Sequence, residues 1–146
     1  MECKQLYNID TNTLINLYPK GMILEVRDSF IHAYPMEKER FTVLYLLGVS
    51  YPHVVTYAEI IDILSSVDIE IETKKLKLLV KELKKELRSY NVRNLIVSIK
   101  NTGYAISNKW VEPNSVHERK DNKLINYVRR MCGIVAMVNK HDTKGQ

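Results

Sequence analysis

The pattern of apolar and polar positions changes its period along the chain, and each change marks a different kind of element. From residue 6 to residue 34, short apolar and β-branched clusters alternate with turn signals such as Pro19–Gly21, which is typical of short strands. We therefore expect three or four antiparallel strands in this stretch. After Pro35 the apolar positions follow helical spacing, so Glu37–Val49 is predicted to be a largely buried helix.

Two further helices are predicted between residues 56 and 88. Thr56 and Glu59 have the spacing of a capping box, in which the hydroxyl accepts from the Glu59 amide and the carboxylate accepts from the cap residue's own amide. A short loop, Ser65–Ile71, leads to the most regular helix, Glu72–Arg88. Its apolar residues share one sector of the helix surface and are Leu76, Leu79, Val80, Leu83 and Leu87.

A β-hairpin is predicted directly after this helix. Leu95–Ile99 is an apolar, β-branched run, and Tyr104–Ser107 is its expected return strand. The turn between them, residues 100–103, ends in Gly103, a residue type that tolerates positive φ.

The C-terminal part of the chain is predicted to lie outside the main domain. We expect one domain over residues 1–109, a linker over residues 110–121 and a tail over residues 122–146 that contains a helix, Asn122–Val138. The apolar residues of that helix follow heptad spacing and are Leu124, Val128, Met131, Val135 and Val138. Gly133 interrupts the seam at a cost of about 1 kcal/mol relative to alanine. The pattern leaves four alternatives open: self-association, binding of a regulatory partner, packing on the chain's own domain, or fraying of the helix.

Composition bounds the class of protein. The chain has 146 residues, of which 45% are hydrophobic and 27% charged, which excludes a collagen, a wholly disordered chain and a small cysteine scaffold. Its two cysteines, Cys3 and Cys132, form no disulfide framework, so we expect a reducing, cytoplasmic compartment. No secretory signal pattern and no apolar run of about 18 residues is present, so no membrane segment is expected.

The charge distribution says more than the net charge of +5. Residues 1–71 carry a net charge of −5, whereas residues 72–104 carry +6 and residues 105–146 carry +4. The basic middle segment contains both the regular helix and the hairpin, which favours an anionic partner for these two elements.

Basic residues are segregated on one face of the helix Glu72–Arg88. Glu82 and Glu86 fall on the opposite flank, so they do not neutralise this stripe, whose members are Lys74, Lys77, Lys81, Lys84, Lys85 and Arg88. One interpretation is a solvated helix face. The other is contact with phosphates, in which each neutralised phosphate releases counterions.

The order of elements favours the second interpretation. A capped helix, a short connector and a long basic helix form a helix-turn-helix-like unit, and a hairpin with a basic tip, Lys100–Thr102, follows at once. An α-helix fits the major groove of duplex DNA, and a flanking hairpin can reach an adjacent groove or phosphate. We therefore predict an α+β fold of the winged helix-turn-helix type with a small N-terminal antiparallel sheet.

In the order of its elements and in its local sequence pattern, the stretch of residues 6–107 resembles the winged-helix DNA-binding domain of the OmpR/PhoB family, including its ToxR- and CadC-like regulators. Residues 36–47 are similar to the family's first helix, and Val54–Ile61 is similar to the start of its second. The spacing Leu76, Val80, Leu83–Leu87 matches the core of its recognition helix. Residues 96–106 are similar to the wing, where the pair Gly103–Tyr104 is the most specific feature.

The resemblance implies that the third helix enters the major groove of double-stranded DNA and that the wing contacts the backbone or minor groove. Carried over by position, it implicates Lys100 and Thr102 in the wing and, in the helix, Lys77, Lys81, Lys84, Lys85 and Arg88. Lys74 of the stripe and Asn101 of the hairpin tip complete the predicted DNA-binding set. The resemblance also implies a contact with RNA polymerase through the loop Ser65–Ile71. Unlike many members of the family, this chain shows no receiver domain before the DNA-binding domain and no membrane helix after it.

Other chemistries find little support. The four histidines are scattered without metal-ligand spacing, Cys132 has no histidine near it in sequence, and no phosphate-binding or dinucleotide motif occurs, so we expect no metal, no cofactor and no enzymatic activity. Most aromatic residues fall at apolar-periodic positions and are predicted to be core, among them Phe30, Phe41, Tyr45 and Tyr104.

Three hypotheses remain for function. The leading one is a sequence-specific, DNA-binding transcriptional regulator that acts as two protomers. The second is a winged-helix interaction module that modulates other regulators without binding DNA, through the predicted exposed Leu78 and the seam of the tail. The third is non-specific binding of RNA or single strands.

Overall fold

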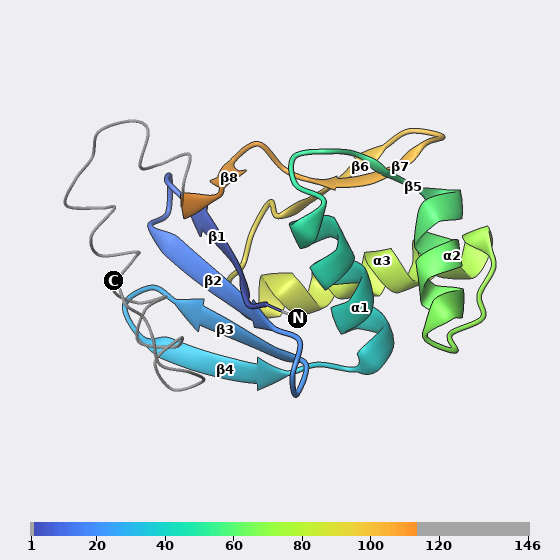
Figure 1. Cartoon of the computed structure of the whole chain (residues 1–146). Helices are drawn as coiled ribbons and strands as arrows, with labels where there is room; N and C mark the ends of the chain where they lie inside the picture. The colour runs from blue at the N-terminus through green and yellow to red at the C-terminus, as the bar shows by residue number, and fades with distance from the viewer. Residues whose placement is uncertain (1, 114–146) are drawn as a thin grey trace.

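Two antiparallel sheets and three helices make up residues 2–113, the part of the chain that this computed structural model describes (Figure 1). The elements follow the order β1 (Lys4–Asn8), β2 (Thr13–Tyr18), β3 (Ile23–Arg27), β4 (Ile31–Pro35), α1 (Lys38–Val49), β5 (Val55–Thr56), α2 (Tyr57–Ser66), α3 (Thr73–Ser89), β6 (Ile96–Ile99), β7 (Gly103–Ile106) and β8 (Trp110–Val111). The predicted α+β architecture is confirmed: a small sheet, three helices and a C-terminal hairpin.

The first sheet has five strands in the order β4-β3-β2-β1-β8. Its first four strands form a meander, as the short apolar clusters and turns predict. The fifth strand is unexpected, because Trp110 pairs with Asn8 and Val111 pairs with Tyr7. Trp110 is fully buried and its indole Nε1 donates to the carbonyl oxygen of Arg93 at 3.0 Å. The predicted linker therefore begins too early, since its first two residues belong to the sheet.

The helix predictions are confirmed to within one or two residues at nearly every boundary. The capping box at α2 is present: the Glu59 amide donates to Thr56 Oγ1 at 3.2 Å, and the Thr56 amide donates to Glu59 Oε1 at 2.8 Å. It stabilises the start of α2 by satisfying amides that have no partner within the helix.

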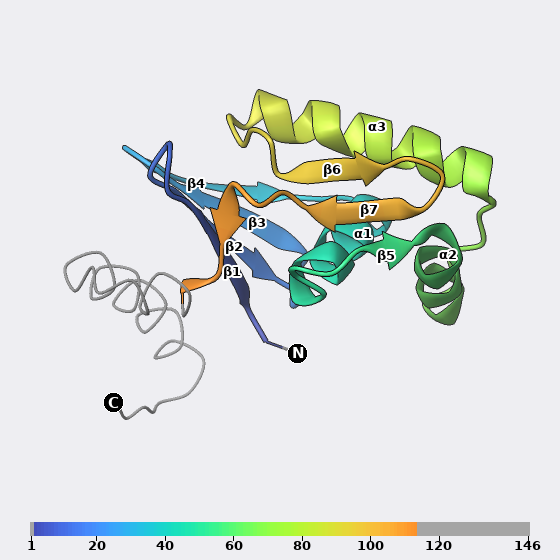
Figure 2. The same cartoon turned by 90° about the horizontal axis from the view of Figure 1, so that it is seen from above.

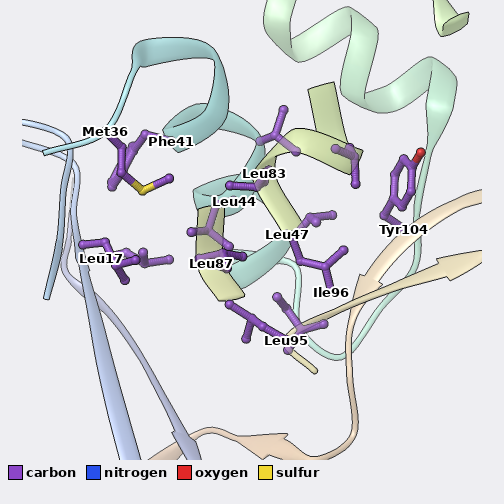
Figure 3. Packing of buried hydrophobic residues seen from close by; sticks show 14 of the residues in the cluster. Leu17, Met36, Phe41, Leu44, Leu47, Leu83, Leu87, Leu95, Ile96 and Tyr104 are labelled. Carbon is purple, nitrogen blue, oxygen red and sulfur yellow. The ribbon is translucent and has the colours of Figure 1, made fainter. Parts of the chain in front are cut away.

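All three helices lie on one side of the five-stranded sheet, and the core fills the space between them (Figures 1 and 2). Leu17 from β2, Leu44 and Leu47 from α1, and Leu83 and Leu87 from α3 meet there (Figure 3). Each fully buried leucine contributes roughly 1.5–3 kcal/mol relative to an exposed one. This packing fixes α3 against α1 and the sheet, so the orientation of its outer face is set by the core.

The prediction that most aromatic residues are core is correct for Phe41 and Tyr104, whereas Tyr45 is only partly buried. It is wrong for Phe30, which is 71% exposed. Phe30 lies at the turn that leads into β4. This strand is at the edge of the sheet, and within residues 2–113 no other strand pairs with its outer side. Local periodicity cannot distinguish such an edge from a central strand.

The predictions for the tail fall outside the described residues, and so do Leu124, Val128, Met131 and Val135. Most of the predicted linker lies there too. Among the described helices, none has the length and apolar character that a membrane crossing requires.

Candidate nucleic-acid interface

The long helix α3 presents one apolar face to the core and the rest of its surface outward. Leu76, Val80, Leu83 and Leu87 are buried at i, i+4, i+7 and i+11, as the spacing predicts. Leu79 is only partly buried at the margin of this face. The basic side chains lie outside this apolar face. Six of them are exposed to solvent: Lys74, Lys75, Lys77, Lys81, Lys85 and Arg88.

One flank of α3 is closed by contacts with α1. Arg40 of α1 donates to Glu86 Oε1 at 3.0 Å and to Glu82 Oε1 at 3.5 Å. Its Nε lies 3.9 Å from Glu37, which is too long for a hydrogen bond. Arg40 therefore pairs with both carboxylates of the acidic flank and directs them away from the basic flank.

Tyr90, at the C-terminal cap of α3, completes this closed flank. Its hydroxyl donates to Glu86 Oε2 at 2.6 Å, and its ring stacks on Tyr34 of β4 with centroids 3.8 Å apart. Burial, followed by the hydrogen bond to Glu86, raises the pKa of Tyr90 to about 12. The neutral phenol is thus held as the donor across the neutral pH range.

The opposite flank faces the hairpin, which lies alongside α3 (Figure 2). Lys84 of α3 is partly buried there: its ammonium donates to Ser98 Oγ of β6 at 2.8 Å and lies 6.0 Å from the ring centroid of Tyr104. Burial, and then the neighbouring Arg88, lower the pKa of Lys84. Lys77 lies 5.1 Å above the ring of Tyr57, the first residue of α2. The predicted stripe therefore contains two lysines that also contact neighbouring elements.

The hairpin is attached to α2 through a three-stranded sheet of order β5-β7-β6. Val55 pairs with Tyr104, Thr56 pairs with Gly103, and the Tyr57 amide donates to the Thr102 carbonyl oxygen at 3.0 Å. Helix α2 and the hairpin are thereby held together, and the hydrogen bond from Lys84 to Ser98 joins α3 to the same hairpin. The tip of the hairpin, Lys100–Thr102, remains exposed.

The reason for glycine at position 103 differs from the predicted one. The residue with positive φ in this turn is Asn101, at 60°. At Gly103 an added Cβ would lie 2.0 Å from the backbone oxygen of Val55, a distance that no real Cβ tolerates. Glycine is needed because β5 approaches β7 closely, and the link between hairpin and α2 depends on it.

The predicted interface residues of α3 and of the hairpin tip are exposed, except Lys84, which is partly buried against Ser98 of the hairpin. Leu78 is 52% exposed on α3, as predicted. The sequence analysis missed Arg40, Tyr57 and Ser98, which hold the flanks of α3. Of these three, only Tyr57 could have been noticed from local sequence, because it directly follows the capping residue Thr56. Arg40 and Ser98 are distant from α3 in sequence and contact it only in the folded protein.

Comparison with known proteins gives structural but no sequence relatives. No protein-family model matches the chain, and no curated protein matches its sequence. The structure resembles the C-terminal domain of the nisin resistance regulator NsrR, a lantibiotic response regulator, with a TM-score of 0.52 and 16% identity over 63% of this chain and 90% of that one.

It also resembles the DNA-binding domain of the response regulator AdeR, solved in complex with an intercistronic region. That match has a TM-score of 0.56 and 14% identity over 64% of this chain and 94% of the other. Both matched structures are domains of response regulators. The predicted resemblance is thus confirmed for the fold alone: the described residues form a winged helix like those of the two response-regulator domains.

Proposed function

We propose that this chain is a sequence-specific, DNA-binding transcriptional regulator that places α3 in the major groove and the tip of its hairpin on the adjacent backbone or minor groove. The observation that carries the proposal is the asymmetry of α3. Its acidic flank is bound by Arg40, while its exposed basic residues have no ion pair within residues 2–113 and the hairpin alongside α3 carries an exposed Lys100 at its tip. The shared fold with a DNA-bound domain supports the same conclusion.

Each part of this surface has a chemical role. The exposed ammonium groups of Lys77, Lys81 and Lys85 supply positive charge for phosphates, and binding releases the counterions of the DNA. Arg88 carries the guanidinium that can pair with two acceptors on guanine. Asn101 and Thr102 supply the polar tip of the wing.

Two protomers would occupy one operator, because a single small module reads few base pairs. Contact with RNA polymerase would use residues 65–71, as the family resemblance implies. This loop is short and defined: Asp68 has φ of 67°, and Ser65 Oγ donates to Glu70 Oε2 at 2.7 Å.

A second function has one observation in its favour. Leu78 is 52% exposed among the lysines of α3, where an apolar side chain suits a protein partner. In this alternative the winged helix contacts another regulator and does not bind DNA.

Fluorescence anisotropy with duplex and single-stranded DNA over a salt series tests the proposal. With about five phosphate contacts from α3 and the hairpin tip, the log–log slope of affinity against salt should be roughly −4 to −5. The double variant Lys81→Ala/Lys85→Ala should reduce that slope by about 2 and weaken binding at every salt concentration. Alanine preserves the helix, so folding should be unaffected.

A matched control removes two exposed lysines that are not part of the proposed interface, Lys20→Ala/Lys38→Ala, and loses the same charge. It should leave the slope almost unchanged. If both double variants behave alike, the protein responds only to net charge and the proposed interface is wrong. Equal affinity for single strands would favour the single-strand hypothesis, and the absence of duplex binding would favour the interaction module.

A further inference from the structure

The edge strand β4 is the only strand within residues 2–113 that has no buried residue. Every residue from Asp28 to Ala33 is exposed, and in this part of the chain Phe30 and Ile31 are the two most exposed large apolar side chains, at 71% and 60%. The strand lies at one end of the five-stranded sheet (Figure 1). An exposed apolar edge strand is a template for pairing with another strand.

One backbone hydrogen bond at each end of the β3–β4 ladder shows which residues of β4 bond inward. The Asp28 amide donates to the Phe30 carbonyl oxygen, and the Met36 amide donates to the Met22 carbonyl oxygen, both at 3.0 Å. Along antiparallel strands, hydrogen-bonded pairs alternate with pairs that are not hydrogen-bonded. The even-numbered residues of β4 therefore direct their backbone groups toward β3.

The odd-numbered residues present their backbone groups to the outside. Ile31 and Ala33 each offer one N–H donor and one C=O acceptor along the free edge, which is the arrangement that a further antiparallel strand requires. Pro35, the last residue of β4, has no N–H and ends this edge. The free edge is thus short and has a defined centre.

The side chains of β4 alternate between two faces of the sheet. Phe30, His32 and Tyr34 form an aromatic row, with successive ring centroids 6.3 Å and 6.1 Å apart. Tyr34 stacks on Tyr90 at the C-terminal cap of α3, with centroids 3.8 Å apart, so this row lies on the face toward the helices and is anchored there.

Charge does not protect this edge. The stretch from Ser29 to Met36 contains no lysine, arginine, aspartate or glutamate. Native edge strands commonly carry such charges, which repel a copy of themselves. Two copies of β4 can therefore approach each other without a contact between like charges along the paired edge.

We propose that β4 pairs with β4 of a second copy of this chain, antiparallel and about a two-fold axis that passes between the two His32 residues. In this register Ile31 lies opposite Ala33 of the second copy, and Ala33 lies opposite Ile31. The paired residues exchange their outward N–H···O=C hydrogen bonds on both sides of the axis.

The side chains favour this register. Ile31 meets Ala33 of the second copy, so a large residue lies beside a small one. On the other face, Phe30 meets Tyr34 of the second copy at a position that is not hydrogen-bonded, where side chains are closest and aromatic pairs stabilise a sheet. The next symmetric registers place Ile31 opposite itself or opposite Pro35, which lacks the N–H.

A second copy is the occupant that matches this edge in hydrogen bonding, in charge and in side-chain size at once. The pairing also closes on itself, because a two-fold contact uses the same edge of both molecules. The opposite edge strand, β8, has only two residues and is too short to add a further strand. The product is a dimer in which the two five-stranded sheets are continuous, rather than a fibre.

The size of the contact predicts a weak dimer. A strand of five residues is about 17 Å long, and pairing along it covers less than the roughly 1,200–2,000 Å² that stable complexes bury. Monomer and dimer therefore exchange, and the dimer population rises with concentration. The edge contains no residue of the proposed DNA interface, so failure of this proposal would leave the proposed function standing.

Amide hydrogen exchange of the full chain, measured by NMR in a dilute and in a concentrated sample, provides the test. The outward amides of Ile31 and Ala33 should exchange like exposed amides in the dilute sample and several-fold more slowly in the concentrated one. The amides of His32 and Tyr34, which bond to β3 in both states, serve as internal controls. A pH of about 7.5 keeps an ordinary imidazole neutral.

The other outcomes of this experiment overturn the proposal. Fast exchange of both outward amides at both concentrations would mean that the edge stays unpaired. Protection at both concentrations, in a sample whose dilute mass is that of a monomer, would mean that another segment of the same molecule occupies the edge.

Engineered cysteines test the register in a Cys3→Ser/Cys132→Ser background. His32→Cys lies opposite itself, with Cα atoms about 4.5 Å apart, so mild oxidation should give a covalent dimer. Ile31→Cys is the matched control, because its copy lies diagonally across the axis at about 7–8 Å, where a disulfide does not form readily. It should cross-link only when mixed with Ala33→Cys. Equal cross-linking of the two single variants would indicate random collision and contradict the register.

A matched pair of lysine substitutions tests the edge itself. Ile31→Lys places like charges on both sides of the axis and should abolish the concentration dependence of exchange at Ala33. Val49→Lys makes the same change at another apolar residue, 47% exposed at the end of α1, and should preserve it. Persistence of the concentration dependence in Ile31→Lys would refute β4 as the contact.

Discussion

The two flanks of α3 differ in how their charges are satisfied. Glu82 and Glu86 pair with Arg40, and Glu86 also accepts from Tyr90, so the acidic flank is bound to the rest of the fold. On the basic flank, ion pairs with carboxylates are absent within residues 2–113, and only Lys77 and Lys84 contact neighbouring aromatic or hydroxyl groups.

This difference shows how a domain of modest net charge can present a strongly positive surface. If the two carboxylates of α3 were free, they would lie one turn from the lysines and partly cancel their field. Because α1 supplies a cation for them, no carboxylate of residues 2–113 compensates the positive field of the other flank.

The largest effect on this asymmetry is expected from Arg40→Met, which preserves the apolar stem but removes the cation. Glu86, whose side chain is only 14% exposed, would lose its charged partner. We expect a loss of about 1–3 kcal/mol in the free energy of unfolding, measured by urea denaturation, because a partly buried carboxylate is left without its cation.

The control for this prediction is the same substitution in a Glu82→Gln/Glu86→Gln background. There, removal of Arg40 should cost much less, and the difference between the two losses measures the coupling. Equal losses in both backgrounds would show that Arg40 acts through packing of its stem, contrary to the closed-flank interpretation.

A smaller effect is expected from Tyr90→Phe, which removes the hydroxyl bound to Glu86. The loss at neutral pH should be about 1–2 kcal/mol, as for a hydrogen bond to a charged group. Since the pKa of Tyr90 in the folded protein is raised to about 12, its contribution is fully present below pH 10 and is lost as the pH rises through 12.

The tyrosinate absorbance of the folded protein measures this directly. The wild-type titration should contain one tyrosine with a pKa of about 12 that Tyr90→Phe lacks, whereas Tyr18, whose pKa burial and Glu25 raise further, should titrate later still in both proteins. An unchanged component at about pH 12 would mean that the phenol of Tyr90 is not held by Glu86, and the account of the closed flank would need another donor.

Local pattern was sufficient to predict most of the fold. The meander, the three helices and the capping box follow from periodicity and from spacing within a few residues. What could not be predicted depends on contacts between distant parts of the chain: Trp110 pairs with Asn8, and Arg40 binds Glu86. No periodicity encodes such pairs, and the same holds for the approach of Val55 that requires Gly103.

The candidate site shows the same division. The exposure of Leu78 and of most basic residues on α3 follows from the helical repeat, because a regular helix fixes which side chains share a face. From the helical repeat alone, Lys84 and Lys85 are predicted to be equivalent members of the basic stripe. The tertiary fold separates them, since β6 lies against one and not the other.

The smallest expected effect concerns the adjacent lysines Lys84 and Lys85 on the basic flank of α3. Lys84 is partly buried and donates to Ser98, so part of its charge is already satisfied within the protein, whereas Lys85 is exposed. Lys85→Gln should reduce the salt slope of duplex binding by close to the roughly 0.9 expected for one phosphate contact. Lys84→Gln retains an amide donor for Ser98 and should reduce it by clearly less. An equal reduction would mean that Lys84 leaves Ser98 to reach the DNA, and that the hairpin does not retain this lysine in the complex.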